Sequence, residues 1–406
     1  MNQPNIRFIG FENKWDEVCL NDIIYPSGIK NRDNLPLESY SISNENGFMP
    51  QDEKFENGGT MKNANKSMYY IVSPKSFAYN PARINVGSIG YYEQNKDVII
   101  SSLYVVFKID DKTCDNQFFF QWFKSDKFKR LVELYQEGGV RLYFFYDKLC
   151  KCKIVKPFIA EQQLIASYFK SVDNLIQETT KKISSLKQLK SASFLSMFPQ
   201  VGETKPRVRF EGFEGEWVKG KLSQFASRIT RKNLKLESQL PLTISAIDGL
   251  ISQNLFFNSV VASSNLSRYY LIKEGEFAYN KSYSNGYPFG AVKRLEKYDK
   301  GALSTLYIVF ALNNNISSDY LVHFFDTTLW HSEVAKRAAE GARNHGLLNI
   351  SAEDFLDIDI VFPSSLDEQQ QIANYFRSLD TQISLETQRL EKLKQIKSAC
   401  LDKMFV

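Results

Sequence analysis

The sequence predicts an α/β protein in which one architecture occurs twice: a mixed α/β domain followed by a long helix, and then the same again. Three observations support this prediction. Motifs recur in the same order about 200 residues apart, strand-like runs alternate with helical patterns in each half, and each half ends in a long stretch without Pro or Gly. A period of this length indicates duplicated domains, because solenoid repeats span only about 20–50 residues.

The duplication is visible in four pairs of motifs. They are RFIGFE at 7–12 and RFEGFE at 209–214, FAYN at 77–80 and 277–280, SLYVVF at 102–107 and TLYIVF at 305–310, and EQQ at 161–163 and 368–370. Similarity is greatest between 165–198 and 372–405, which align without a gap and are about half identical, and weakest in the middle of the domains. The tail segments therefore share one task, whereas the domains differ.

Each domain combines strand-like runs with one helical pattern that stops at glycine. The strands are predicted at 68–72, 98–107 and 153–155 and again at 268–272, 304–310 and 357–362, and the helices at 118–137 and 319–340. Proline and glycine mark a linker after the first tail. The predicted order is a first domain (1–157), a first long helix (158–198), a linker (199–208), a second domain (209–363) and a second long helix (364–406).

The tail segments are predicted to be long amphipathic helices, because their apolar residues recur at spacings of three, four and seven. Helices of this length measure roughly 55 Å and carry matching stripes, so they are expected to pair as a coiled coil. The alternative is that each helix caps its own domain. Lysines such as Lys190 and Lys397 are predicted to face solvent. The predicted pairing residues are Ile176, Ile183, Leu186, Leu189, Ile383, Leu390, Leu393 and Ile396.

The composition indicates a globular protein of a reducing compartment. Hydrophobic residues make up 43% and charged residues 24%, and the five cysteines form no disulfide framework. There is no leader-like N-terminus and no apolar run of roughly 20 residues, so we expect a cytoplasmic protein that does not enter the membrane. The net charge of +5 permits a nucleic-acid partner without requiring one.

No catalytic constellation is found in the sequence. A P-loop, a G-x-S-x-G elbow and a proline-rich amino-methyltransferase loop are all missing. The closely spaced pair Cys150 and Cys152 has no further ligands nearby, and the histidines at 323, 331 and 345 lack a metal-ligand spacing. We therefore expect no catalytic residues, no metal site and no cofactor bound by this chain.

Several predicted loops mix cations with amides and aromatics, as contacts to phosphates and base edges require. For any one residue, an ordinary solvated loop is an equally good interpretation. The residues at 79, 80, 279 and 280 recur in both halves, which also fits a structural role. The candidates are Tyr79, Asn80, Arg83, Asn85, Arg141 and Tyr143 in the first half and Arg228, Arg231, Lys232, Asn280, Lys281, Tyr283, Asn285, Lys293, Arg294, Arg343, Asn344 and His345 in the second.

These motifs together resemble the specificity subunits of type I restriction–modification enzymes. The resemblance rests on the R-F-x-G-F-E-x-x-W segments, FAYN, the EGARNHGLLNIS run at 340–351 and the P-x(3 or 4)-EQQ-x-I-A-x-Y-F start of each long helix. It covers essentially the whole chain. The 340–351 run departs from the first half, which has GGVRLY at 138–143, so a role for Arg343, Asn344 and His345 transfers at most to Arg141.

The resemblance implies two target-recognition domains, each of which reads one part of a split, asymmetric site on double-stranded DNA. It implies that the long helices pack antiparallel. It also implies recruitment of two methyltransferase subunits and possible addition of restriction and translocase subunits. S-adenosylmethionine, ATP and Mg²⁺ are then expected on those partners.

Two other functions fit parts of the sequence. A coiled-coil scaffold with protein-binding domains would share the helices but would show no salt-dependent affinity for DNA. The recognition portion of a fused methyltransferase–nuclease would share the domains but would need catalytic motifs on the same chain, and none is found.

Overall fold

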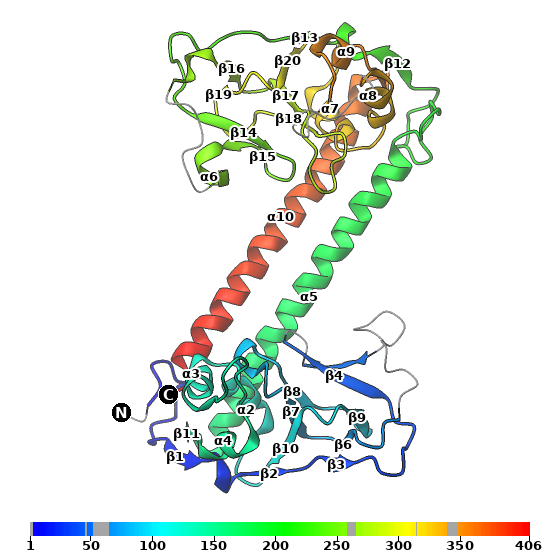
Figure 1. Cartoon of the computed structure of the whole chain (residues 1–406). Coiled ribbons are helices and arrows are strands. Elements are labelled where there is room, and N and C mark those ends of the chain that lie inside the picture. Colours follow the sequence, from blue (N-terminus) through cyan, green and yellow to red (C-terminus); the bar gives the residue numbers. More distant parts are fainter. Residues whose placement is uncertain (1–2, 45–46, 52–64, 258–264, 314, 339–347) are drawn as a thin grey trace. The chain divides into compact units, whose positions relative to one another are not determined.

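The computed structural model describes residues 3–44, 47–51, 65–257, 265–313, 315–338 and 348–406. The chain divides into two compact units (Figure 1). Unit 1 comprises Met1–Lys181 with Thr387–Val406, and unit 2 comprises Lys182–Glu386. Both units are mixed α/β and share most of the order of their elements, so the predicted duplicated α/β fold is confirmed.

Unit 1 is built on a four-stranded antiparallel sheet of order β2–β10–β7–β8. A five-stranded sheet of order β3–β6–β9–β4–β5 has one parallel pair, β4 with β9, and β1 pairs separately with β11. The strands are β1 (Asp16–Cys19), β2 (Ile24–Pro26), β3 (Ile29–Lys30), β4 (Ser39–Ser43), β5 (Gly47–Pro50), β6 (Tyr70–Val72), β7 (Ser76–Tyr79), β8 (Ile89–Tyr92), β9 (Val98–Ile100), β10 (Val105–Ile109) and β11 (Lys153–Lys156).

Unit 2 repeats most of this topology, but its second sheet has four strands, of order β15–β14–β19–β16, where that of unit 1 has five. Its four-stranded antiparallel sheet has the order β13–β20–β17–β18, β14 and β19 again form the parallel pair, and β12 pairs with β21. The strands are β12 (Val218–Lys221), β13 (Ala226–Arg228), β14 (Pro241–Ser245), β15 (Gly249–Ser252), β16 (Tyr270–Lys273), β17 (Phe277–Asn280), β18 (Ala291–Arg294), β19 (Lys300–Leu303), β20 (Ile308–Leu312) and β21 (Asp359–Phe362).

Most helices occupy equivalent positions in the two units, but in the described residues the 3-10 helices at 84–86 and 266–268 and the α-helix at 253–257 have no counterpart. The 3-10 helices are η1 (Leu20–Asp22), η3 (Ile84–Val86), η4 (Leu222–Gln224) and η5 (Leu266–Arg268). The α-helices are α2 (Asn116–Trp122), α3 (Asp126–Tyr135), α4 (Tyr146–Lys151), α5 (Ile159–Met197), α6 (Gln253–Phe257), α7 (Ser318–Phe324), α8 (His331–Arg337), α9 (Ala352–Leu356) and α10 (Leu366–Lys403). No helix in the described part of the chain is both long and apolar enough to cross a membrane.

Two predicted elements are each divided in the structure. The strand predicted at 98–107 becomes β9 and β10 in different sheets, because a turn closed by the Tyr104 N–H and the Ser101 carbonyl (3.1 Å) separates them. The helix predicted at 118–137 becomes α2 and α3, because the Ser125 side chain accepts the Phe128 N–H and caps a new helix. The pattern at 319–340 divides in the same way into α7 and α8.

A buried glutamine joins the start of each long helix to its domain. In unit 1, Gln162 donates to the Pro157 carbonyl at 2.7 Å and accepts the backbone N–H of Asp115, the N-cap of α2, at 2.9 Å. In unit 2, Gln369 makes the equivalent bonds at 2.8 and 2.7 Å, the second with the N-cap of α7. The second residue of each EQQ motif therefore fixes the long helix to the domain helices.

Within unit 1, the first part of α5 packs against the last part of α10. Asp173 accepts a hydrogen bond from Lys397 at 2.5 Å, and the Tyr168 hydroxyl lies 3.3 Å from the Cys400 sulfur. Because the residue numbers rise along one helix and fall along the other, this part of the pair is antiparallel.

Within unit 2, the same contacts recur with the two helices exchanged. Asp380 accepts from Lys190 at 2.6 Å, and the Tyr375 hydroxyl lies 2.8 Å from the Ser193 hydroxyl. Phe194 stacks on Phe376 with ring centroids 4.2 Å apart. The predicted antiparallel helix pairing is thus present in each unit.

The helix-pairing prediction is wrong for two residues. Leu189 is 47% exposed and Ile396 is 48% exposed, because the neighbouring Lys190 and Lys397 turn into the seam instead. The prediction that these two lysines face solvent is therefore also wrong. The other predicted pairing residues are buried or half-buried: Ile176, Ile183, Leu186, Ile383, Leu390 and Leu393.

The end of each long helix completes a core. In unit 1, Phe405 is buried against Phe118 and Phe169, with centroids 5.2 and 6.0 Å away. In unit 2, Phe198 is buried against Trp217 and Phe376, both at 5.9 Å. The core of each unit therefore contains the long helix of one repeat and the helix end of the other.

Candidate nucleic-acid interface

Two loops lie side by side in unit 1. One joins β7 to β8 (80–88), and the other follows α3 (136–145). The Phe144 N–H donates to the Pro81 carbonyl at 3.0 Å, and the buried Phe144 ring packs against Tyr79 and Phe128. Asn80 shapes the first loop, because its side-chain oxygen accepts the Ala82 N–H at 3.0 Å. Both loops are thus fixed to the core.

The second loop of unit 1 is a short hairpin. Glu137 and Tyr143 exchange backbone hydrogen bonds of 2.9 and 2.8 Å. Gly138 has a φ of +138°, and an added Cβ would lie 2.1 Å from the Arg141 carbonyl oxygen, so the turn requires glycine. Past the hairpin, the Tyr143 and Phe145 rings stack at 5.5 Å with an interplanar angle of 4°.

The two loops present cations without acidic partners. Arg83 and Arg141 are exposed, and in the described part of the chain neither guanidinium has an ion pair or hydrogen bond. The nearby Glu137 pairs with Lys148 at 2.8 Å. Asn85 is also exposed in η3. The structure therefore brings the predicted contacts Arg83, Asn85 and Arg141 together on one pair of neighbouring loops.

Unit 2 has the equivalent pair of loops. The Leu348 N–H donates to the Lys281 carbonyl at 3.0 Å, and the Lys281 ammonium reaches the Ile350 carbonyl at 3.2 Å. In the loop between β17 and β18, Tyr283 and Asn285 are exposed. Asn280 repeats the turn of Asn80 by accepting the Ser282 N–H at 3.0 Å. The predicted contacts Arg343, Asn344 and His345 lie outside the described residues.

Tyr79 and Tyr279 are core residues, so their prediction as DNA contacts is wrong. Both are fully buried, and burial raises the pKa of each hydroxyl well above its usual range. The Tyr279 hydroxyl donates to the Phe289 carbonyl at 2.8 Å. Their recurrence reflects the identical strands β7 and β17.

Several predicted cations of unit 2 are engaged inside the protein. Arg231 makes two hydrogen bonds of 2.8 Å with Glu276, Arg294 pairs with Asp319 at 2.8 Å, and Lys293 pairs with Asp326 at 2.8 Å. These three are structural ion pairs. Sequence spacing could not reveal them, because each acid lies more than twenty residues away.

The remaining two cations differ from each other. Lys232 lies 4.1 Å above the Tyr270 ring, and Lys30 repeats this contact with Tyr70 at 3.9 Å in unit 1, so Lys232 has a structural role. Arg228 pairs with Glu353 at 2.7 Å, but both side chains are largely exposed. Such a pair contributes little, so Arg228 remains available to another anion.

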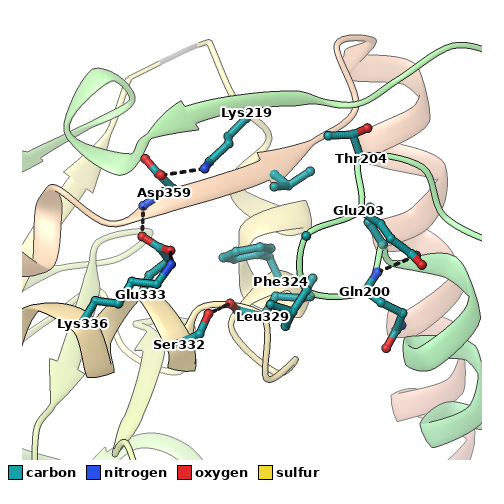
Figure 2. A pocket seen from close by; sticks show the side chains of 14 residues that line it. Gln200, Glu203, Thr204, Lys219, Phe324, Leu329, Ser332, Glu333, Lys336 and Asp359 are labelled. Atoms are coloured by element: carbon teal, nitrogen blue, oxygen red, sulfur yellow. Dashed lines mark hydrogen bonds and ion pairs between the residues drawn. The ribbon is translucent and has the colours of Figure 1, made fainter.

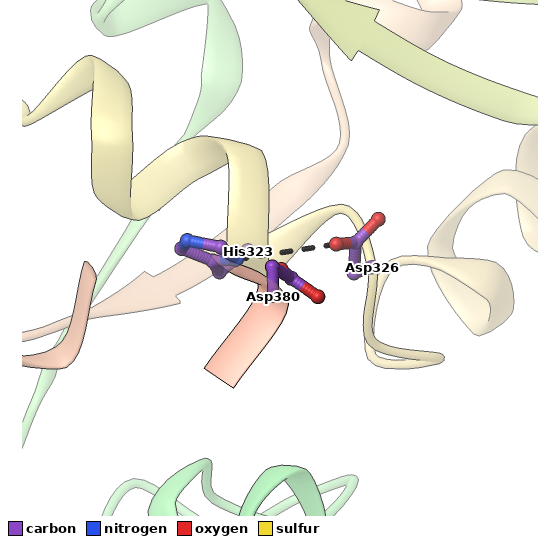
Figure 3. Close-up of side chains that lie close together, drawn as sticks. All are labelled: His323, Asp326 and Asp380. Atoms are coloured by element: carbon purple, nitrogen blue, oxygen red, sulfur yellow. Dashed lines mark ion pairs between the residues drawn. The ribbon is translucent and has the colours of Figure 1, made fainter. Parts of the chain in front are cut away.

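A cluster of side chains in unit 2 brings three possible metal ligands together (Figure 3). His323, Asp326 and Asp380 have donor atoms within 4.8 Å of one another, and the buried His323 Nδ1 accepts no hydrogen bond in the described structure. However, Lys190 lies 2.6 Å from Asp380, and Lys293 lies 2.8 Å from Asp326. The two ammonium groups neutralise the two carboxylates.

The equivalent place in unit 1 explains this cluster. Gln121 occupies the position of His323, is buried, and donates to Asp173 at 3.2 Å, while Lys397 pairs with the same carboxylate. Burial lowers the pKa of His323, so the imidazole is neutral near pH 7. The cluster is therefore the unit 2 copy of a contact, present in both units, that joins a domain helix to the long helices.

A small pocket in unit 2 has a volume of about 240 Å³ (Figure 2). The linker at 199–204 forms one side, and Phe324 and Leu329 line its apolar part. Its charges pair with one another: Lys219 with Asp359 at 2.9 Å, and Lys336 with Glu333 at 2.6 Å. The remaining acid of the lining, Glu203, accepts the Gln200 N–H at 3.2 Å, so the described lining offers a ligand no cation without an acidic partner.

The fold is that of a duplicated mixed α/β protein whose two units carry equivalent surface loops. The family model described as type I restriction modification DNA specificity domain matches residues 12–188 and 216–395, so the chain belongs to this family, whose members supply specificity and not catalysis. The two matches coincide with the two copies of the repeat.

Solved structures share the fold. The S subunit of a type I restriction–modification system from M. genitalium is 14% identical, with a TM-score of 0.59 and coverage of 100% of this chain and 99% of that one. A chain from a study of complex assembly and conformational transition of the type I R-M system is 13% identical, with a TM-score of 0.52 and coverage of 96% and 97%. A comparison with curated proteins finds no match.

Proposed function

We propose that this chain recognises double-stranded DNA within a type I restriction–modification complex and reads an asymmetric site in two parts, one with each unit. The observation that carries the proposal is the pair of equivalent loop surfaces. Their anchors are the same, since Phe144 to Pro81 in unit 1 repeats as Leu348 to Lys281 in unit 2. Equivalent anchors would hold the two loop surfaces against DNA in the same way, whereas different exposed residues would contact different bases.

The exposed residues have the chemistry that DNA requires. Arg83 and Arg141 in unit 1 can bind phosphates or guanine edges, and Asn85 can bind adenine. In unit 2, the predicted contacts Tyr283 and Asn285 are exposed in the loop between β17 and β18. Because Arg83 has no arginine counterpart in the loop between β17 and β18, the two parts of the site are expected to differ.

The paired helices are the proposed docking surface for two methyltransferase subunits. Leu189 and Ile396 hold equivalent positions in the repeats and are exposed to nearly the same degree, 47% and 48%. An exposed apolar residue that recurs at equivalent positions of the two repeats suits two copies of one partner. Those partners are proposed to bind S-adenosylmethionine, and restriction or translocase subunits to use ATP and Mg²⁺, in the cytoplasm.

The proposal is tested with the full chain co-expressed with a type I methyltransferase subunit. The purified complex is expected to bind one genomic DNA motif much more tightly than other DNA, with an affinity that falls steeply between 50 and 200 mM salt, by a factor on the order of 10³–10⁵ if six to ten phosphates are contacted. A coiled-coil scaffold that binds only protein would form the complex without salt-dependent DNA affinity, and that result would reject the proposal.

A further inference from the structure

An apolar side chain is exposed at the tip of the unit 1 hairpin, where it does not fill a core. Val140 is fully exposed, and Leu142 in the same tip is 42% exposed. Single exposed apolar residues are common on protein surfaces. Here, however, Arg141 lies between the two, and its guanidinium has no acidic partner in the described structure.

The tip is fixed to the domain at its base. The two Glu137–Tyr143 hydrogen bonds close it, Gly138 permits its turn, and the buried Phe144 anchors its base. A side chain on such a tip loses little conformational freedom on binding, which favours specific contact with a rigid partner. The stiff χ1 of a β-branched valine adds to this effect.

The charged residues around the tip indicate which kind of partner it binds. Arg141 and the neighbouring loop's Arg83 are unpaired cations, and the acids nearby, Glu137 and Asp147, both contact Lys148. A surface with free arginines around an apolar tip suits a polyanion that carries apolar groups in a groove. In the DNA major groove, the apolar group at the base edges is the 5-methyl group of thymine.

Resting on the proposed function, we propose that the hairpin tip enters the major groove and that Val140 contacts the methyl group of a thymine in the part of the site read by unit 1. Arg141 then reaches the adjacent phosphate or guanine edge. Unit 1 therefore requires an A·T pair at one position, and it distinguishes that pair partly by the thymine methyl.

The test uses the chain assembled with its methyltransferase partner. Exchange of residues 1–157 for another family member's domain identifies the part of the site that unit 1 reads. Each thymine in that part is then replaced by uracil, which removes the methyl group and preserves pairing. One replacement is expected to weaken binding about fourfold, the equivalent of one buried methylene.

Val140→Ala should bind the thymine site about as weakly as the intact chain binds the uracil site, and the same uracil should then have no further effect. Leu134→Ala is the matched control, because Leu134 is 70% exposed on α3 of the same unit. It should retain the full uracil effect.

Three results would overturn the inference while leaving the proposed function intact. They are a unit 1 sequence without an A·T pair, specific binding that no uracil weakens, and a Val140→Ala variant that keeps the uracil effect. Loss of a DNA kink in Val140→Ala without any uracil effect would indicate insertion between bases from the minor groove and would also overturn it. Absence of any specific binding by the intact complex would instead reject the proposed function.

Discussion

Arg7 and Glu161 form a two-pronged ion pair, with hydrogen bonds of 2.7 and 2.8 Å, between the first residues of the chain and the start of α5. Arg209 and Glu368 repeat it at 2.6 and 2.8 Å. The glutamate side chains are only 2% and 1% exposed. Removal of one partner leaves a largely buried charge uncompensated.

Glu161→Gln is therefore expected to destabilise unit 1 by about 3 kcal/mol, the usual cost of breaking a buried pair. Urea denaturation of the full chain measures this change. Glu17→Gln is the control, because Glu17 pairs with Lys153 at 2.7 Å while both side chains are largely exposed. A Glu161 variant as stable as the Glu17 variant would show that the recurring pair is incidental.

Arg83→Ala and Arg141→Ala are each expected to reduce the salt dependence of DNA binding. Each lost phosphate contact lowers the slope of log K against log salt by about 0.9 in magnitude. The measurement is fluorescence anisotropy at several salt concentrations. Lys75→Ala is the control, because Lys75 is exposed but pairs with Asp111 at 3.1 Å. Unchanged slopes in both arginine variants would place the DNA elsewhere.

Leu189→Asp and Ile396→Asp are each expected to remove one methyltransferase subunit from the complex, and the double variant to remove both. A buried carboxylate without a partner is strongly unfavourable in an apolar interface. Native mass spectrometry counts the subunits. Leu195→Asp is the matched control, because Leu195 is 63% exposed on the same helix and Asp402 stands at its equivalent position. A folded double variant that retains both subunits would contradict this docking surface.

Asp319 is expected to make unit 2 sensitive to acid. Burial alone would raise the pKa of its carboxyl, but hydrogen bonds from Arg377 and Arg294 lower it from 3.8 to about 2. A lowered native pKa stabilises the fold while the group is ionised, so this contribution is present above about pH 4 and is lost as the pH falls towards 2.

Asp319→Asn should therefore lose less stability than the wild type between pH 4 and 2. Urea midpoints recorded across this range measure the difference. Asp402→Asn, at an exposed position of α10, is the control and should follow the wild type. An Asp319→Asn curve parallel to that of the wild type would show that the pairing with Arg294 and Arg377 does not affect acid stability.

The architecture could be predicted from the sequence. The duplication is visible as recurring local motifs, and the long helices are indicated by the absence of Pro and Gly from the tails. The sequence could not show what the motifs do. Glu161 and Gln162 are hydrogen-bonded to residues up to 154 positions away, and no local pattern reports such a partner. The R-F-x-G-F-E and EQQ motifs are thus structural joints, since Arg7 and Arg209 pair with the first residue of each EQQ motif.

Individual site residues were predicted less well, for two physical reasons. Cations were selected without their distant acids, so Arg231 and Arg294 were included although Glu276 and Asp319 engage them. Apolar spacing along the helices also predicts too wide a seam. A step of six residues from Ile183 to Leu189 turns about 240° around the helix axis, so Leu189 lies outside the seam. The hairpin tip at Val140 could not be predicted as a contact, because its exposure is visible only in the structure and its residue type alone does not indicate a contact.

The central claim is that the two units read different parts of one site independently. The most direct measurement replaces residues 209–363 with the second domain of another family member and sequences the methylated positions in DNA treated with the assembled complex. The expected result is a motif in which one part is unchanged and the other is new. A palindromic motif, or a motif in which both parts change, would contradict it.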